Sequence, residues 1–289
     1  MKLQDIKDVL SFAAFRPDAD DSSSSCPKRF PGQRYLLLNV SRDHVSWRAV
    51  GKKGEFEGGD SMEGDLRDVA PQMSEDWKAM TDSGHVVVSI NNRFVISLEH
   101  NLSRRGGYQE LIRSNPKAVL GAKCDRGKRY AVHHNPETSA SLLLACDDSL
   151  VKSVEENLSA SGLKPARVCC GLYAMMTQYL HDFYRQKPND RPQNMVLLAC
   201  CEGSVGILNH KGGQWSEFRA RSGVYQEEIE PVAQLTSKFF QEMAPGTPVV
   251  FLNDRRDTPF AQRMLEGLKN FAMQDATQSD HLWTVIGKS

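Results

Sequence analysis

The stretch MVLLACCEGSVGILNHKGGQWSEF, from Met195 to Phe218, decides the fold. Its first apolar run, Met195 to Cys200, is followed by a tight turn at Glu202-Gly203-Ser204 and by a second run from Val205 to Asn209. A glycine turn and a third run complete the stretch. Short apolar runs bounded by turn residues are typical of paired strands. We therefore expect three consecutive strands here.

The same pattern occurs once more, nearer the N-terminus, between Tyr35 and Gly59. The residues that match at one constant offset of 160 positions are Leu37 with Leu197, Asn39 with Ala199, and Val45 with Val205. A solenoid repeats at much shorter intervals than this. The spacing therefore indicates two related halves in one chain.

The composition is that of an ordinary globular protein. The chain has 289 residues, of which 40% are hydrophobic and 25% charged. Lys and Arg together number 36, and so do Asp and Glu, so net charge gives no reason to expect a nucleic-acid partner. No stretch approaches the roughly 18 apolar residues of a membrane helix, and the N-terminal residues lack the apolar run of a signal peptide. We expect a cytoplasmic protein without a transmembrane segment.

Cysteine and histidine do not form a metal-binding pattern. The seven cysteines include the pairs Cys169-Cys170 and Cys200-Cys201, but no CxxC motif. Neighbouring residues on a strand point to opposite faces, so neither these pairs nor His133-His134 can readily chelate one ion. We expect reduced, partly buried thiols, no metal site and no catalytic residue.

The order of the expected elements divides the chain into three parts. Residues 1–33 hold an amphipathic helix, Lys2 to Phe15, and a linker. The helix can dock on the body, bind a partner or lie on a membrane. Residues 34–186 form a first half that includes an inserted subdomain at about 86–165, and residues 187–289 form a second half. Strands that alternate with helices in both halves predict an α/β protein.

In the second half, four elements are expected after the opening strands. They are a long helix from Tyr225 to Met243, a buried strand from Pro248 to Leu252, a helix from Thr258 to about Met273, and a closing strand from His281 to Ile286.

Two halves that each open with strand, turn, strand, turn, strand resemble the actin-like ATPase fold, a duplicated fold of the ribonuclease H-like class. The insertion resembles the subdomain of the PilM group of pilus-assembly proteins, with the cytoplasmic part of GspL and the division protein FtsA as more distant relatives. The phrases that carry this resemblance are Ser161-Gly162-Leu163-Lys164-Pro165 and Cys170-Gly171-Leu172-Tyr173-Ala174. It covers the chain from about Arg34 to Met273.

The resemblance implies a phosphate-binding turn after the first strand of each half. In the first turn, Asn39 stands at the acidic position and Ser41 at the glycine position, followed by Asp43. Ser41 and Asp43 are therefore the candidate cofactor-binding residues of this turn, as vestiges of a phosphate site.

The second turn also lacks residues that the actin-like family has at this place. Ala199 replaces the aspartate that orients Mg²⁺ or water, and Cys201 replaces a glycine, while Gly203 and Ser204 remain as candidates. Alanine offers no oxygen ligand to Mg²⁺, and a side chain obstructs the approach of backbone N–H groups to phosphate. The expected adenosine turn, at Asn253 to Arg256, lacks its glycine cluster. We expect neither ATP nor Mg²⁺ as a cofactor.

The segment from Arg104 to Arg129 carries eight basic residues and two acidic ones. One interpretation is a solvated helix face. The other is a docking surface for an acidic partner segment or anionic lipid, with Arg104, Arg105, Arg113 and Lys117 as its candidate contacts.

The leading hypothesis follows from the resemblance. It implies a non-catalytic scaffold on the cytoplasmic face of an inner membrane, in a type IV pilus or type II secretion platform. The scaffold would bind a peptide of a membrane-anchored, PilN-like partner and so be peripheral to the membrane; oligomerisation is left open. The alternative is an actin-like ATPase or sugar-kinase-like enzyme with an atypical nucleotide site.

Overall fold

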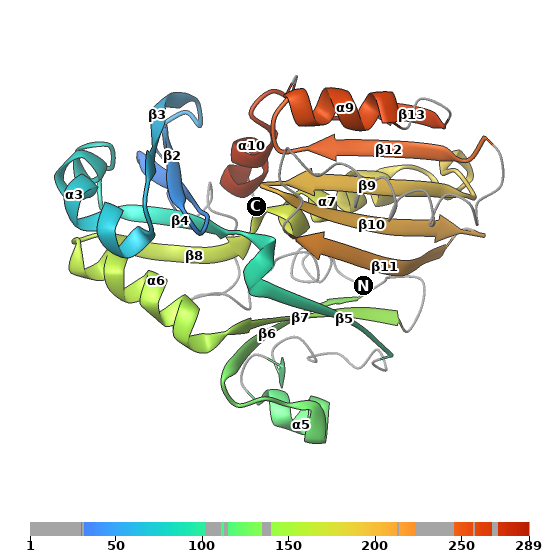
Figure 1. Cartoon of the computed structure of the whole chain (residues 1–289), viewed down its shortest axis with the longest axis horizontal. Helices are drawn as coiled ribbons and strands as arrows, with labels where there is room; N and C mark the ends of the chain where they lie inside the picture. Colours follow the sequence, from blue (N-terminus) through green and yellow to red (C-terminus); the bar gives the residue numbers. More distant parts are fainter. Residues whose placement is uncertain are drawn as a thin grey trace.

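The computed structural model contains two five-stranded sheets and a smaller three-stranded sheet (Figure 1). The structure describes residues 30, 32–101, 111–112, 115–134, 140–212, 214–222, 246–256, 258–267 and 271–288. The expected helices at Lys2 to Phe15 and Tyr225 to Met243 lie outside the described residues. Within the described ranges, no helix combines the length and the apolar character that crossing a bilayer requires.

The first large sheet has the strand order β3-β2-β1-β4-β8. Its strands are β1 (Tyr35–Val40), β2 (His44–Val50), β3 (Phe56–Glu63), β4 (His85–Ile90) and β8 (Lys164–Cys170). Helices α3 (Leu66–Ala79) and α6 (Asp148–Ala160) cover one face of this sheet (Figure 1). The rings of Trp47 and Trp77 meet edge to face on that side, with centroids 5.6 Å apart.

The second large sheet repeats this plan, with the strand order β11-β10-β9-β12-β13. Its strands are β9 (Met195–Cys201), β10 (Ser204–Lys211), β11 (Gln214–Ser222), β12 (Pro248–Asn253) and β13 (Ala272–Asp275). In both sheets the first strand pairs antiparallel with the second strand and parallel with the fourth. These pairs are β1 with β2 and β4, and β9 with β10 and β12. The expected duplication is confirmed, because β1 and β9, like β2 and β10, begin 160 residues apart.

Two helices lie between the large sheets: α7 (Gly171–Arg185) and α10 (His281–Lys288). The hydroxyl of Tyr35 on β1 donates to the carbonyl of Gly287 at the end of α10, at 3.1 Å. The expectation of a closing strand over His281 to Ile286 was wrong, since this segment is α10. The run is short and apolar on nearly every side because it is buried between two sheets, and periodicity cannot separate a strand from a buried helix there.

The helix expected to reach Met273 ends earlier. Helix α9 (Pro259–Gly267) covers the outer face of the second sheet, and β13 follows it as an additional edge strand parallel to β12. Strand β13 has only four residues, of which two are polar and three are exposed, so it carries little of the apolar pattern by which strands are found.

The insertion between β4 and β8 forms the small antiparallel sheet, with the order β5-β7-β6. Its elements are β5 (Val95–Asn101), α5 (Pro116–Leu120), β6 (Lys128–His134) and β7 (Ala140–Asp147). The described residues also include short 3-10 turns, η2 (Asn92–Phe94) and η3 (Gly121–Lys123) in this region and η4 (Pro188–Asp190) before β9. Arg129 ties this sheet to α6, since its guanidinium lies 2.6 Å from Asp148 Oδ1 and 2.8 Å from Glu155 Oε1.

Gly171 lies where α10 and the two large sheets meet. A Cβ atom on this residue would be 2.6 Å from Leu282 Cδ1, 2.9 Å from Ser89 Oγ and 3.1 Å from Cys201 Sγ. We predict that Gly171→Ala lowers the free energy of unfolding by about 1–3 kcal/mol through overpacking, although alanine is the better helix former. Urea denaturation measures this change.

The matched control is Gly58→Ala, where a Cβ atom would meet nothing within 4 Å. Its effect on the free energy of unfolding is expected within about 0.5 kcal/mol. A Gly171→Ala protein as stable as the wild type would contradict the close packing between the halves.

Candidate functional site

The turns after β1 and β9 face each other across the junction of the two halves. The second turn consists of Glu202 and Gly203, which join the paired residues Cys201 and Ser204. Both turn residues have positive φ, 46° for Glu202 and 70° for Gly203, as a type I′ hairpin turn requires. This backbone geometry fixes the direction in which the Glu202 side chain leaves the turn.

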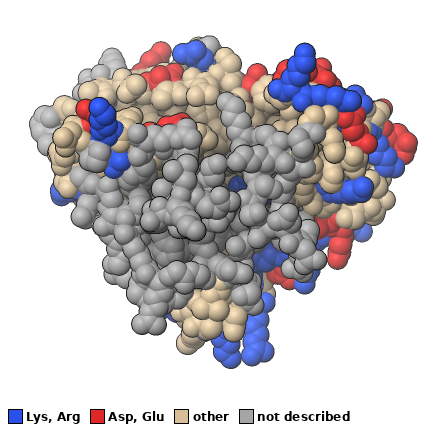
Figure 2. Space-filling model, turned by 180° about the vertical axis from the view of Figure 1, so that it is seen from behind, with Lys and Arg blue, Asp and Glu red and all other residues tan. Residues whose placement is uncertain are grey.

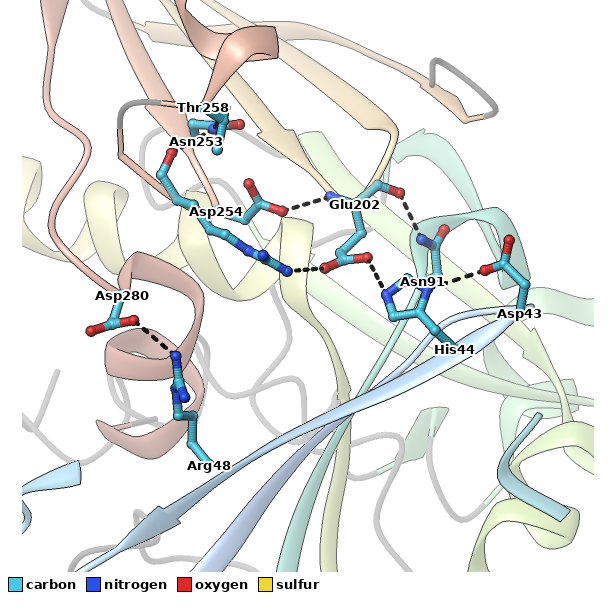
Figure 3. Close-up of polar contacts among 10 residues, drawn as sticks. Asp43, His44, Arg48, Asn91, Glu202, Asn253, Asp254, Thr258 and Asp280 are labelled. Atoms are coloured by element: carbon cyan, nitrogen blue, oxygen red, sulfur yellow. Dashed lines mark hydrogen bonds and ion pairs between the residues drawn. The ribbon is translucent and has the colours of Figure 1, made fainter. Parts of the chain in front are cut away.

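The carboxylate of Glu202 contacts cations from both halves (Figure 3). Its Oε2 lies 3.2 Å from His44 Nε2 at the start of β2, and its Oε1 lies 3.6 Å from Arg255 Nη2 after β12. His44 Nδ1 in turn lies 3.1 Å from Asp43 Oδ1. We call these four residues, Asp43, His44, Glu202 and Arg255, the clasp. The side chains of Glu202 and His44 are 9% and 29% exposed, so water screens their contact weakly, whereas the exposed Arg255 and Asp43 are screened more strongly.

The clasp holds His44 in its charged form. The hydrogen bond with Glu202 is the largest cause that raises the pKa of His44 from 6.5 to about 9; burial opposes the shift, and Asp43 adds to it. The same contact with His44 lowers the pKa of Asp43. His44 is therefore an imidazolium at neutral pH. Negative and positive side chains then alternate along the clasp, from Asp43 through His44 and Glu202 to Arg255, so each neighbouring pair attracts.

The backbone of the second turn is also held from both halves. Asp254 Oδ2 accepts from the Glu202 N–H at 3.0 Å, and Asn91 Nδ2 donates to the Glu202 carbonyl at 2.7 Å. Asn91 directly follows β4 and Asp254 directly follows β12, which are equivalent strands of the two sheets. The duplication thus places two side chains, Asn91 and Asp254, at equivalent positions, and they form hydrogen bonds with the carbonyl and the N–H of Glu202. Burial, and then the charge of Glu202, raise the pKa of Asp254 to about 6.

Ser204 joins a second polar group across the junction. Its Oγ lies 3.1 Å from Ser222 Oγ and 3.4 Å from Asn91 Oδ1, and Asn92 Nδ2 donates to Ser222 Oγ at 3.0 Å. Ser204 is 1% exposed, so its hydroxyl serves the contact between β10, β11 and the residues after β4. A further ion pair, between Arg48 and Asp280 at 3.8 Å, links β2 to the start of α10 (Figure 3).

Behind the first turn, a row of buried neutral polar groups crosses the first sheet. Asn39 pairs with Ser46 on β2 and with Ser89 on β4, and Ser41 follows at the turn itself. Asn39 Nδ2 and the three hydroxyls are buried, with no hydrogen-bond partner among the described protein groups. Such groups are normally satisfied by internal water.

The residues expected to bind a cofactor therefore have other neighbours. Asp43 belongs to the clasp, Gly203 supplies a turn conformation, and Ser41 and Ser204 are buried. Of the expected partner contacts, Lys117 is exposed on α5, at the far end of the insertion from the clasp (Figure 1). Arg104, Arg105 and Arg113 lie outside the described residues.

The cysteines behave as the sequence indicates. Five of the six described thiols are buried, and Cys124 is half-buried. Burial raises the pKa of Cys146 to about 12 and raises those of Cys170 and Cys201 as well. These thiols are protonated at neutral pH and are poor nucleophiles.

Solved structures share this architecture. Cyto-EpsL, the cytoplasmic domain of EpsL, an inner membrane component of the type II secretion system of Vibrio cholerae, aligns with a TM-score of 0.52 at 11% identity, over 88% of this chain and 94% of its own. The PilM-PilN type IV pilus biogenesis complex aligns with a TM-score of 0.54 at 14% identity, over 88% and 94%. A Bacteroides thetaiotaomicron protein of unknown function with an actin-like ATPase fold gives 0.55 at 10% identity, over 88% and 96%.

The chain has the actin-like ATPase fold. At these identities the likeness extends to the fold alone. In sequence, no protein-family model and no curated protein matches the chain.

An actin-like fold implies a nucleotide and Mg²⁺ between the two turns, and the residues present do not fit them. Ala199 and Asn39 bring no carboxylate to the strand ends, and the Glu202 N–H is taken by Asp254. The Glu202 carboxylate itself neutralises the two cations that a phosphate would need. Among the described residues, no group of three or more His, Cys, Asp or Glu side chains is placed to hold a metal ion.

We predict that Glu202→Gln returns the pKa of His44 from about 9 toward its ordinary value of 6.5, because the substitution removes the largest cause of the shift. Ring NMR signals followed from pH 5 to pH 10 measure the titration, with His44→Gln for assignment. Since the folded pKa is the higher one, the stability that the clasp contributes is complete below pH 6.5 and is lost as pH rises through about 9.

The control is Glu75→Gln, which removes an exposed carboxylate of α3 that pairs with Lys78 and has no contact with the clasp. It should leave the titration of His44 unchanged. A wild-type His44 that titrates near 6.5 would mean that the contact with Glu202 does not form in solution.

Proposed function

We propose that this chain is a non-catalytic scaffold built on the actin-like fold. It works at the cytoplasmic face of a bacterial inner membrane, in the assembly platform of a type II secretion system or a type IV pilus. The observation that carries the non-catalytic part is the position of the Glu202 carboxylate, between His44 and Arg255 at the turns where relatives of this fold would bind phosphate.

The energetics of the clasp argue against nucleotide binding. A triphosphate placed between the turns would have to separate Glu202 from both cations and release its N–H from Asp254. The Glu202 side chain is only 9% exposed, so leaving its carboxylate without these cations is destabilising. The displaced carboxylate would also remain beside the phosphates, where like charges repel. In actin-like ATPases a bound nucleotide would hold the two halves together. In this chain the side chains of the clasp hold them together instead.

The platform assignment draws its support from the similar structures. Cyto-EpsL belongs to an inner membrane component of a secretion system, and PilM forms a complex with PilN in type IV pilus biogenesis. In our proposal this chain likewise binds a peptide of a membrane-anchored partner and is held at the membrane through it.

The insertion offers the contact surface for this partner. Lys117, Lys123 and Arg126 are exposed on α5 and the residues after it. Figure 2 shows basic side chains gathered at the lower tip of the molecule, where α5 lies in Figure 1. We propose that Arg104, Arg105, Arg113 and Lys117 contribute to the same basic surface, which suits an acidic segment of the partner.

We predict that Mg-ATP at millimolar concentration neither raises the melting temperature of the wild-type protein nor is hydrolysed by it. Differential scanning fluorimetry and phosphate release measure the two effects. A saturable shift with ATP that Gly203→Val abolishes would overturn the non-catalytic role. Gly212→Val, in the turn between β10 and β11 and also at positive φ, is the control for the strain of the substitution itself.

The platform role is tested with the same protein preparation. The wild-type chain should retain a single-span inner-membrane protein from detergent-solubilised membranes of its source, and Lys117→Glu with Lys123→Glu should lose it. If no inner-membrane protein is retained, the platform assignment fails even where the result with ATP stands.

A further inference from the structure

Strand β3 is an exposed edge of the first large sheet. It is the terminal strand in the order β3-β2-β1-β4-β8 and pairs with β2 along one side only. Seven of its eight residues are exposed, and Met62 is half-buried. Figure 1 shows β3 beside β2 at the edge of the first large sheet. Alternate residues of such a strand direct backbone N–H and C=O groups outward, where they can pair with another chain.

The side chains along this edge are acidic. Glu57, Asp60 and Glu63 lie on β3, Glu55 precedes it and Asp65 follows it, and all five are exposed. None of them forms an ion pair with another described residue. Of the neighbouring cations, Lys52 is paired with Asp82 and Arg48 with Asp280. Lys53, in the turn between β2 and β3, is exposed and forms no ion pair with a described residue. The five carboxylates of the edge outnumber this unpaired cation, so the edge remains acidic.

This charge selects between the possible occupants of the edge. Two copies of β3 placed side by side would set carboxylates against carboxylates, which is destabilising for directly opposed residues. A strand with lysine or arginine at those positions would instead place opposite charges against the carboxylates, which stabilises the pairing. The edge thus resists pairing with itself and favours a basic strand.

The centre of β3 also leaves room for another backbone. Gly58 and Gly59 are adjacent there. A Cβ atom on Gly58 would meet nothing within 4 Å, whereas one on Gly59 would overlap the carbonyl oxygen of Trp47 on β2, so only Gly58 leaves open space. Glycine within a strand often marks a place where a second backbone approaches closely. At the start of the strand, Phe56 is 38% exposed and offers an apolar contact to a side chain of the added strand.

We propose that β3 is a docking edge for an extended, basic segment of another protein, which adds to the first sheet as a sixth strand beside β3. Main-chain hydrogen bonds supply the affinity, and the carboxylates of Glu57, Asp60 and Glu63 select the charge. The three carboxylates belong neither to the clasp nor to α5, although Glu63 lies opposite His44 on β2. The proposal does not rest on the scaffold role.

The test uses a fluorescein-labelled peptide of alternating lysine and valine, eight residues long, with the full-length protein. Anisotropy measures its binding. Two further peptides have the same sequence and charge, with N-methyl groups on the odd or on the even residues. An added strand bonds to its neighbour through alternate residues only, so one methylated peptide should bind like the parent and the other should lose binding.

Charge reversal gives the second arm. Glu57→Lys with Glu63→Lys should weaken binding by about tenfold or more, since two opposite-charge contacts become repulsive. The matched control is Glu156→Lys with Glu266→Lys, which makes the same charge change at exposed positions on α6 and α9 and should leave binding within about threefold, because distant surface charges are screened.

Three results would overturn the proposal. The parent peptide does not bind, or both methylated peptides bind as well as the parent, which would mean that charge alone attracts it. The third is a β3-mediated dimer of this chain, seen by sedimentation, that the peptide does not displace.

Discussion

The contact of the Glu202 carboxylate with His44 and Arg255 is the constraint on which the arrangement of the two halves depends. It is a charge-assisted contact in a poorly exposed place, and such contacts are stronger than neutral ones. It also requires the turn backbone to keep two residues at positive φ, which only the glycine of the pair adopts without strain. Asp254 and Asn91 hold the Glu202 N–H and carbonyl in this strained position.

The duplication of the fold places the two residues that hold this turn at equivalent positions. Asn91 and Asp254 follow equivalent strands, and the ends of those strands approach the same turn from opposite sides. The two halves are nevertheless used differently. The second turn provides the carboxylate at the centre of the clasp, whereas the first provides the cation His44 and its partner Asp43. Two copies of one unit have become complementary to each other.

Much of the fold could be predicted from the sequence because the offset of 160 residues is a property of the chain itself. The apolar runs of β1, β2, β9 and β10 carry it directly. Helix α10 was misjudged because burial on all sides removes the periodicity by which a helix is distinguished. For the site, the sequence singled out the turns that contain Asp43 and Gly203, and the structure brings these two turns together. The loss of phosphate ligands at Asn39 and Ala199 stays a prediction. Nothing in the sequence indicated that His44 and Glu202 meet, since the two residues are far apart in the chain and belong to different sheets.

The most direct test of the clasp is a double-mutant cycle on His44 and Glu202, with His44→Gln, Glu202→Gln and the double variant unfolded in urea. At pH 7 the account predicts a coupling free energy of about 1–2 kcal/mol in favour of the wild-type pair. The coupling should disappear above pH 10, where His44 has lost its proton. Additive effects at pH 7, with no coupling, would contradict the claim that this ion pair joins the two halves.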